Sequence, residues 1–366
     1  MRVLHLGSNI ASQMTMSVEA LRGIGVEARG LAVRGGNEKF TEDSPAVETV
    51  PEWLERGSVS WFVGHGRRYY RVLSLIEWAD VLHWHFGTTF LRNNFDLWWA
   101  RFLEKPGVVE FWGSDIRIGE VEGRDNCFFR QHASTDYVDR QSAERSRSLQ
   151  TAFARAGFEC LVGCKSMYPH VQRDLFPNIH LVRQRIPVHR YAYRPPEADK
   201  KNPLIVHCPS SLSLKGSAFV LNAIEQLRAK HDFEFRLVHN VSHETALAQI
   251  GDADIFVDQL ILGAHGIAAV EGMAMGKPVI CFVKPSMMAL YPPNLPLVSA
   301  NPDTVTQVLE DLICDGQRRH DLGVRGRAYA EKHHDAPRLA HELTALYYSL
   351  LRRRGSRVEV GSVAVG

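Results

Sequence analysis

Hydrophobic residues in the first half of this chain fall into short continuous runs separated by longer stretches with helical spacing. The opening residues predict a strand at Val3–Leu6, a helix at Met14–Gly23 and a second strand at Val26–Val33. The same pattern predicts further strands at 81–85, 108–111, 160–162 and 180–182, and a helix at 94–103. Because short apolar runs are typical of buried strands, this alternation predicts a doubly wound parallel α/β sheet.

A polar, proline-rich stretch between Ile186 and Pro203 interrupts this pattern and predicts a domain boundary. Beyond it the alternation begins again. The predicted strands are 204–208, 234–238, 254–257 and 279–283, and the predicted helices are 218–230, 244–250 and 267–275. Because 366 residues exceed what one hydrophobic core organises, we expect two Rossmann-like domains, at 1–190 and 191–335.

The C-terminal residues separate into two parts. Residues 336–354 predict a long amphipathic helix, because leucines recur there at helical spacing, at positions 339, 343, 346 and 350. Residues 355–366 have small side chains and no helical period, and we expect them to form a flexible tail.

Composition and charge narrow the class of protein. Apolar residues make up 45% and charged residues 23%, which is ordinary for a globular chain, and a net charge of +2 lacks the basic excess of nucleic-acid-binding proteins. Of six scattered cysteines only Cys160 and Cys164 lie close together, so we expect no metal site and a reducing compartment. Without a long apolar run or a signal-peptide segment, a cytoplasmic protein is expected.

Residues 252–281 carry the most specific pattern in the chain. A glycine-broken turn at 263–266 leads into the predicted helix, which Gly276 and Pro278 bring to an end. The free backbone N–H groups at such a helix start favour a diphosphate. Glu271 lies roughly 7.5 Å further along, where its carboxylate could accept hydrogen bonds from ribose hydroxyls. The local pattern alone equally fits any strand-helix-strand unit with Glu271 on a solvated face.

The run Glu-Gly-Met-Ala-Met-Gly-Lys-Pro-Val-Ile from Glu271, after Val-Asp-Gln and the glycine turn, resembles the donor-binding segment of GT-B glycosyltransferases. The similarity is greatest to the large retaining family called group 1 or family 4. That family has a Glu-x7-Glu pattern, whose second glutamate binds the nucleotide ribose and whose first lies near the donor sugar. Glu271 matches the second. The first falls at Gly263, so the resemblance leaves the sugar to other groups, such as the backbone from Gly263 through Gly266 to Ile267.

Over nearly the whole chain, the resemblance implies two Rossmann-like domains that face a central cleft. The terminal helix at 336–351 would cross back onto the first domain, which would bind the acceptor, and the active site would lie in the cleft. The second domain would bind the nucleotide-sugar donor.

The loop Ser210–Ser217 follows a predicted strand, so Lys215 projects at the carboxyl edge of the sheet, where open α/β sheets bind ligands. A lysine there could bind a diphosphate as a point charge. The loop is similar to one of the family that ends in Lys-Gly, but Ser210 and Ser213 stand where an arginine is usual. A solvated loop lysine is the alternative.

The first domain offers candidates at three strand ends. Gly7, Ser8 and Asn9 follow the first strand without the G-x-G-x-x-G pattern of dinucleotide binders, which argues against a dehydrogenase. In the related enzymes this loop faces the donor phosphate and the acceptor. We therefore assign Gly7 and Ser8 to the donor and Asn9 to the acceptor or sugar.

At the next strand end, His85 is a candidate for acceptor contact or proton transfer, and His83 is interpreted as a structural histidine on the opposite face. Phe111-Trp-Gly-Ser-Asp resembles the family's His-Gly-x-Asp motif, with Trp112 in place of histidine. Trp112 could stack on a sugar, and Asp115 is either a catalytic group or an N-cap.

The run Arg67–Arg71 is cationic and aromatic. Most such runs form a solvated face. The alternative is contact with an anionic membrane surface or a lipid-linked diphosphate acceptor.

These observations and the resemblance predict a glycosyltransferase that moves a sugar from a nucleotide-diphosphate sugar to a glycan, glycolipid or small molecule, as in polysaccharide biosynthesis. The resemblance further implies retention of the anomeric configuration and no bound metal. The expected catalytic groups are His85, Asp115 and Lys215, without a cofactor or bound metal. We expect the enzyme in the cytoplasm, with peripheral contact at the inner membrane face as an option. A nucleotide-sugar 2-epimerase of the same fold and a non-catalytic GT-B binding module are the alternatives.

Overall fold

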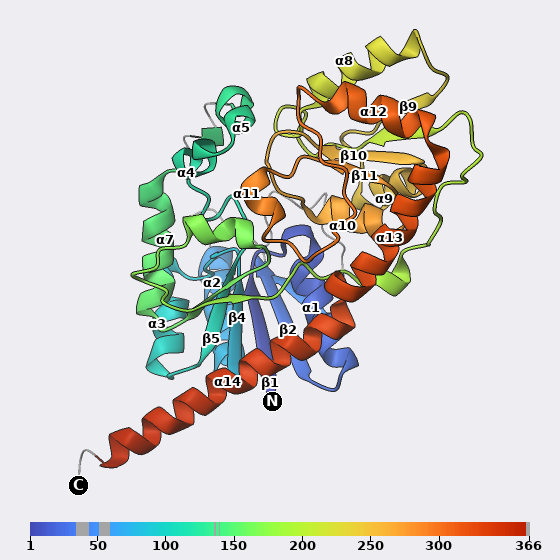
Figure 1. Cartoon of the computed structure of the whole chain (residues 1–366). Helices are drawn as coiled ribbons and strands as arrows, with labels where there is room; N and C mark the ends of the chain where they lie inside the picture. The colour runs from blue at the N-terminus through green and yellow to red at the C-terminus, as the bar shows by residue number, and fades with distance from the viewer. Residues whose placement is uncertain (34–43, 51–58, 135–136, 139, 364–366) are drawn as a thin grey trace. The chain divides into compact units, whose positions relative to one another are not determined.

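The computed structural model describes residues 1–33, 44–50, 59–134, 137–138 and 140–363. They form two compact units (Figure 1). Unit 1 comprises Met1–Ile116, Ala143–Arg185 and the chain from Ala336 on, and unit 2 comprises Arg117–Ser142 and Ile186–Asp335. The sequence analysis gave all of 1–190 to the first domain, whereas residues 117–142 and 186–190 belong to unit 2.

Unit 1 contains a parallel sheet of seven strands in the order β3-β2-β1-β4-β5-β6-β7. The strands are β1 Arg2–Gly7, β2 Glu27–Val33, β3 Val47–Val50, β4 Val81–His85, β5 Gly107–Phe111, β6 Glu159–Val162 and β7 Ile179–Leu181. The order reverses between β1 and β4. Open α/β sheets bind their ligands at the carboxyl ends of the strands that flank such a reversal.

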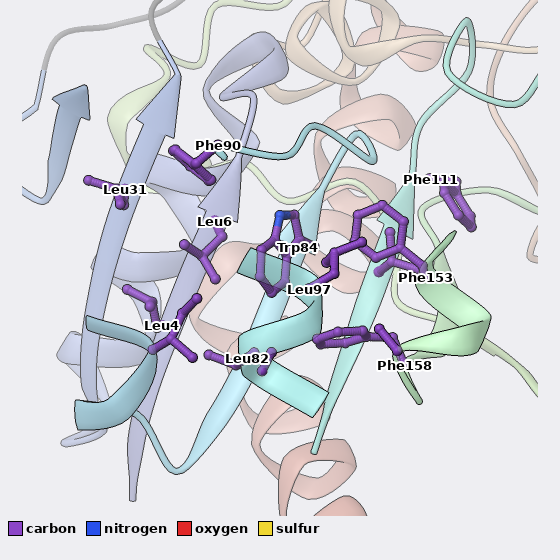
Figure 2. Packing of buried hydrophobic residues seen from close by; sticks show 14 of the residues in the cluster. Leu4, Leu6, Leu31, Leu82, Trp84, Phe90, Leu97, Phe111, Phe153 and Phe158 are labelled. Carbon is purple, nitrogen blue, oxygen red and sulfur yellow. The ribbon is translucent and has the colours of Figure 1, made fainter. Parts of the chain in front are cut away.

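One face of this sheet packs on helices α2, α3 and α7. Their bounds are α2 Val59–Trp78, α3 Phe95–Phe102 and α7 Ala143–Arg155. Because side chains alternate along a strand, every second residue of each strand points to this face. Figure 2 shows the resulting apolar cluster, which includes Leu4, Leu6, Leu82, Trp84, Phe111 and Phe153.

The opposite face packs on α1 (Gln13–Gly23) and α14 (Ala336–Val363). Leu339, Leu343 and Tyr347 of α14 are buried in a cluster with Val3 and Val81 of the sheet. The predicted packing of the C-terminal helix on the first Rossmann-like domain is therefore confirmed. The helix continues to Val363, past the predicted boundary at residue 354.

Unit 2 contains a parallel sheet of four strands in the order β11-β10-β8-β9, which reverses between β8 and β10. The strands are β8 Leu204–His207, β9 Glu234–Leu237, β10 Ile255–Gln259 and β11 Val279–Cys281. The principal helices are α8 Ser217–Arg228, α9 His243–Asp252, α10 Ile267–Ala274, α12 Val305–Cys314 and α13 Gly316–His334. Short helices α4 (Gly119–Arg124), α5 (Cys127–His132) and α11 (Pro285–Met288) belong to the same unit.

Within the described part of the chain, no helix has both the length and the apolar character that crossing a membrane requires.

Candidate functional site

Lys215 lies at the carboxyl edge of the unit 2 sheet, where the strand order reverses. Its loop joins β8 to α8, and Gly216 ends it in a left-handed conformation, with φ of +74°. The ammonium Nζ lies 2.6 Å from Oδ1 of Asp258 on β10, and the lysine side chain is only 14% exposed. The solvated loop lysine considered from the sequence is therefore wrong. The pair bridges the two strands at the reversal, and Asp258 balances the lysine charge.

His207, at the end of β8, ties this loop down, and the sequence analysis missed it. Its Nδ1 lies 2.8 Å from the carbonyl oxygen of Val257, and its Nε2 lies 2.8 Å from Oγ of Ser217. Burial lowers the pKa of His207 to about 4, so the ring is neutral at physiological pH. A neutral ring carries one N–H, which the carbonyl accepts, and its other nitrogen accepts from the serine.

The turn before α10 exposes the amino end of that helix. Gly263 has φ of +70°, and Gly266 occupies the N-cap, so no side chain caps the helix. Residues 266–268 are partly exposed, whereas 269–274 are buried. The first turn of α10, which carries the partial positive charge of the helix amino end, is therefore partly accessible to solvent. Gly276, with φ of +76°, follows the helix end as the sequence predicts.

Glu271 lies on α10, one turn beyond that exposed end, and is 3% exposed. The hydroxyl of Tyr191 donates to its Oε1 over 3.1 Å, and Nε2 of His243 lies 2.9 Å from the same oxygen. His243 is the first residue of α9. The alternative of a glutamate on a solvated helix face is wrong, because this carboxylate is buried among hydrogen-bond donors.

A group of charged residues from segment 117–142 lies beside Gly263. Lys284 Nζ contacts Glu122 Oε1 at 3.2 Å and Asp125 Oδ1 at 2.8 Å. A Cβ atom at position 263 would lie 3.0 Å from Asn126 Nδ2 and 3.1 Å from Lys284 Cδ. Glycine at this position therefore leaves room for the lysine and its two carboxylates. Chain spacing gave no signal for this group, since its members are about 160 residues apart.

In unit 1, the loop after β1 meets the end of β4 at the strand-order reversal. Gly7 has φ of +112°, and a Cβ there would lie 2.2 Å from the carbonyl oxygen of His85, so only glycine fits. Ser8 Oγ is 2.7 Å from Thr88 Oγ1. Asn9 Oδ1 accepts hydrogen bonds from the backbone N–H groups of Met14 and Thr15, 3.1 and 3.3 Å away. These three predicted residues lie together, with Asn9 bound to the start of α1.

His85 points into the sheet packing, together with His83 and His5. Nε2 of His85 lies 2.9 Å from Nδ1 of His5, and the His83 and His85 rings stack with centroids 4.4 Å apart. The prediction that His83 and His85 lie on opposite faces is wrong, because residues two apart on a strand share a face. Burial lowers the pKa of all three histidines well below its ordinary value.

These three histidines have close ring nitrogens, but their geometry does not suit a shared metal ion. The His83 and His85 rings are inclined by only 2°, and His5 by 29° to each. A metal binds an imidazole in the ring plane, about 2.0 Å from the nitrogen, and stacked rings do not share such a point. Nδ1 of His83 lies 2.6 Å from the Tyr347 hydroxyl, and its Nε2 lies 3.1 Å from Oε2 of Glu110. We interpret the cluster as a hydrogen-bonded ladder.

Asp115 and Trp112 are held by contacts within unit 1. Oδ1 of Asp115 accepts from the N–H groups of Gly113 and Ile116, 2.7 and 3.0 Å away, and Oδ2 accepts from Trp112 over 3.1 Å. Burial raises the pKa of this carboxyl, and these N–H groups oppose the rise. The Trp112 ring packs 5.3 Å from the Arg185 guanidinium. Asp115 therefore binds the backbone of its own turn and is not an N-cap, because the next helix, α4, begins at Gly119 with Ile118 at its N-cap.

No family model and no curated protein matches the sequence. Solved structures do match. Sucrose-phosphate synthase from Thermosynechococcus elongatus aligns with a TM-score of 0.64 at 14% identity, over 96% of this chain and all of the other. HepE from Anabaena, in complex with UDP and glucose, aligns with a TM-score of 0.53 at 14% identity, over 96% of this chain and all of the other. A trehalose-6-phosphate synthase studied for glycosyl transfer with retention aligns with a TM-score of 0.57 at 11% identity, over 95% of this chain and 99% of the other. Two Rossmann-like units with these neighbours identify the chain as a member of the GT-B fold.

Proposed function

We propose that this protein is a glycosyltransferase that binds a nucleotide-diphosphate sugar at the carboxyl edge of the unit 2 sheet. The observation that carries the proposal is the arrangement around α10. The helix presents an exposed, uncapped amino end, and the buried carboxylate of Glu271 lies one turn further on. Both lie beside the strand reversal of an open parallel sheet. Likeness to HepE, which was solved with UDP, makes a uridine diphosphate sugar the first donor to test.

In this proposal Glu271 accepts hydrogen bonds from the ribose hydroxyls. Its Oε1 already accepts from Tyr191 and His243, which fix the orientation of the carboxylate. The amino end of α10 receives the diphosphate. As the bond from the sugar to the diphosphate breaks, negative charge grows on the leaving group, and the helix N–H groups stabilise it.

Lys215 is the second stabilising group in the proposal. Because Asp258 compensates it, the lysine adds attraction for the diphosphate only if the phosphate oxygens share or replace that contact. The proposed acceptor, a sugar-containing or lipid-linked molecule, is assigned to the carboxyl edge of unit 1, beside Gly7, Ser8 and Asn9. His85 and Asp115 are buried and bonded within unit 1, so we assign them positioning roles there.

We further propose transfer with retention and without a bound metal. Likeness to trehalose-6-phosphate synthase supports retention. The acidic pair Asp252 and Asp254 precedes β10 and so lies at the amino edge of the sheet, away from Lys215. Arg236 contacts Asp252, and Lys200 contacts Asp254. Transfer should therefore continue in excess chelator, and loss of activity that manganese or magnesium restores would contradict this part.

The deciding experiment is a titration with UDP, GDP, ADP and dTDP, followed by donor turnover with the preferred sugar nucleotide. Glu271→Gln should weaken nucleotide binding, whereas Glu310→Gln should not. The latter is a matched control, since Glu310 also pairs with a histidine of unit 2, His231, at 2.8 Å. Absence of binding to every nucleotide would contradict the donor site. Binding without turnover or hydrolysis would favour a non-catalytic module, which Gly263 in place of a glutamate makes the second candidate.

A further inference from the structure

Helix α3 of unit 1 carries a row of exposed aromatic side chains. Phe95, Trp98 and Phe102, the aromatic ladder, are 36%, 52% and 63% exposed. Phe95 stacks on Trp98 with ring centroids 5.1 Å apart, and Trp98 stacks on Phe102 at 5.5 Å. Single exposed apolar residues are ordinary, but a contiguous set marks an interaction site. The ladder is therefore a candidate surface for contact with an apolar partner.

The neighbouring helix α2 extends this surface. Tyr69 of α2 contacts Phe95, with centroids 6.1 Å apart, and Tyr70 is 76% exposed. The sequence analysis considered the whole run from Arg67 for a membrane surface. In the structure Arg68 is buried and donates to the carbonyl oxygen of Phe90, and Arg71 pairs with Glu48. The run is thus not a cationic patch by itself, and the ladder on α3 provides most of the exposed aromatic area.

Cationic side chains flank the ladder on its other side. Helices α3 and α7 lie side by side (Figure 1) and border an open groove of about 670 Å³, which Trp98 lines. Four charged residues line the same groove, the arginines Arg101, Arg147 and Arg155 and the acidic Glu144. Arg147 pairs with Asp174, whereas Arg101 donates to the carbonyl oxygen of Arg155 and meets no carboxylate in that contact. An aromatic ridge thus borders a groove in which arginines outnumber acidic residues by three to one.

We propose that this surface docks the protein on an anionic lipid bilayer, with the aromatic ladder in the headgroup region and the groove arginines on lipid phosphates. Aromatic rings prefer the membrane interface, and arginines near the surface add electrostatic attraction to anionic lipids. Neither contact requires a helix that spans the bilayer. The combination favours a lipid surface over a protein partner, because the ridge is aromatic and three arginines outnumber Glu144, the one acidic residue among those that line the groove. The inference is independent of the proposed transfer reaction, since binding is measured without donor.

The test is cosedimentation of the full chain with vesicles of phosphatidylcholine alone, and with vesicles that also contain phosphatidylglycerol. Wild type should bind the anionic vesicles at least tenfold more tightly. Trp98→Ala with Phe102→Ala should weaken that binding at least tenfold, whereas the matched control Tyr348→Ala, at a 51% exposed aromatic of α14, should not. Arg101→Glu with Arg155→Glu should remove the preference for anionic lipid, and Arg318→Glu in unit 2 should leave it unchanged.

Thermal unfolding of each variant separates loss of binding from loss of folding. Equal binding by wild type and the Trp98/Phe102 variant would overturn the proposal, and so would failure of wild type to bind either vesicle. A wild-type dimer that Trp98→Ala with Phe102→Ala makes monomeric, without vesicle binding, would instead show that a second copy covers the ladder.

Discussion

The two units each bury a glutamate, and the two carboxylates are held in different ways. Glu110 of unit 1 is fully buried on the sheet face beneath α14, where both of its oxygens bind the guanidinium of Arg185, over 3.0 and 2.6 Å. His83 also contacts Oε2. Among the residues that the structure describes, Glu271 of unit 2 contacts no lysine or arginine, and its two partners, Tyr191 and His243, both bind Oε1.

This difference separates a structural carboxylate from one that can serve a ligand. A bidentate guanidinium binds both oxygens and neutralises the charge, so neither oxygen of Glu110 is available to a ligand. Glu271 has one oxygen outside the bonds from Tyr191 and His243, and it lies near the exposed start of a helix. Burial alone therefore does not identify the functional group. The functional group is identified by the hydrogen-bond partners of the carboxylate and by its place on the sheet.

Removal of the cation in unit 1 should have the largest effect. Arg185→Met leaves Glu110 buried without its guanidinium partner, which should lower the free energy of unfolding of unit 1 by about 3–5 kcal/mol. Urea unfolding measures this. Arg353→Met is the control, because the partly exposed pair of Arg353 with Glu159 should contribute about 1 kcal/mol or less. Equal losses in the two variants would show that Arg185 does not hold the carboxylate.

Acid should weaken unit 1 next. Burial lowers the pKa of His5, His83 and His85 below the unfolded value of 6.5, so the unfolded chain binds more protons in acid. Stability is then complete above pH 6.5 and falls as pH drops, by up to about 1.4 kcal/mol per pH unit for each histidine. Unfolding measured between pH 7.5 and 5.5 checks the sign, and His83→Asn should reduce the slope. A flat profile would contradict neutral buried rings.

Substitution of Glu271 in unit 2 should lower the affinity for ligand more than it lowers the stability of the fold. Glu271→Gln keeps the volume but removes a charged acceptor, so affinity for the preferred nucleoside diphosphate should fall by about 1.5–3 kcal/mol, roughly 10- to 150-fold. Calorimetric titration measures the affinity, and urea unfolding should change little. If the variant instead lost stability without losing affinity, Glu271 would be a second structural carboxylate like Glu110.

Lys215 should give the smallest and most diagnostic change. Lys215→Met should weaken diphosphate binding about tenfold, part of it because Asp258 is left unpaired. The double variant Lys215→Met with Asp258→Asn removes both charges. Affinity that stays low in the double variant supports a direct phosphate contact. Full recovery would mean that the lysine only neutralises Asp258.

The sequence predicted the elements well, because each depends on neighbouring residues. The predicted strand Val81–His85 is identical to β4, and the turn at Gly263 and the helix from Ile267 are as predicted. The partners of Glu271 were not predictable. Tyr191 and His243 lie 80 and 28 residues away, and no local pattern encodes which loops meet. The shared face of His83 and His85 was predictable, since strand periodicity alone requires it.

The return of α14 to unit 1 has a consequence for synthesis on the ribosome. This helix covers the sheet face that carries His5, His83 and Glu110, and it is translated only after unit 2. Unit 2 places about 150 residues between Arg185 and Ala336, which take roughly 8–30 s to translate. During that interval the hydrogen-bonded cluster of His5, His83 and Glu110 lacks Tyr347 of α14, whose hydroxyl lies 2.6 Å from Nδ1 of His83. Unit 2 can complete its core before α14 is available to unit 1. During synthesis, unit 1 is therefore the part of the chain with an uncovered sheet face that needs protection.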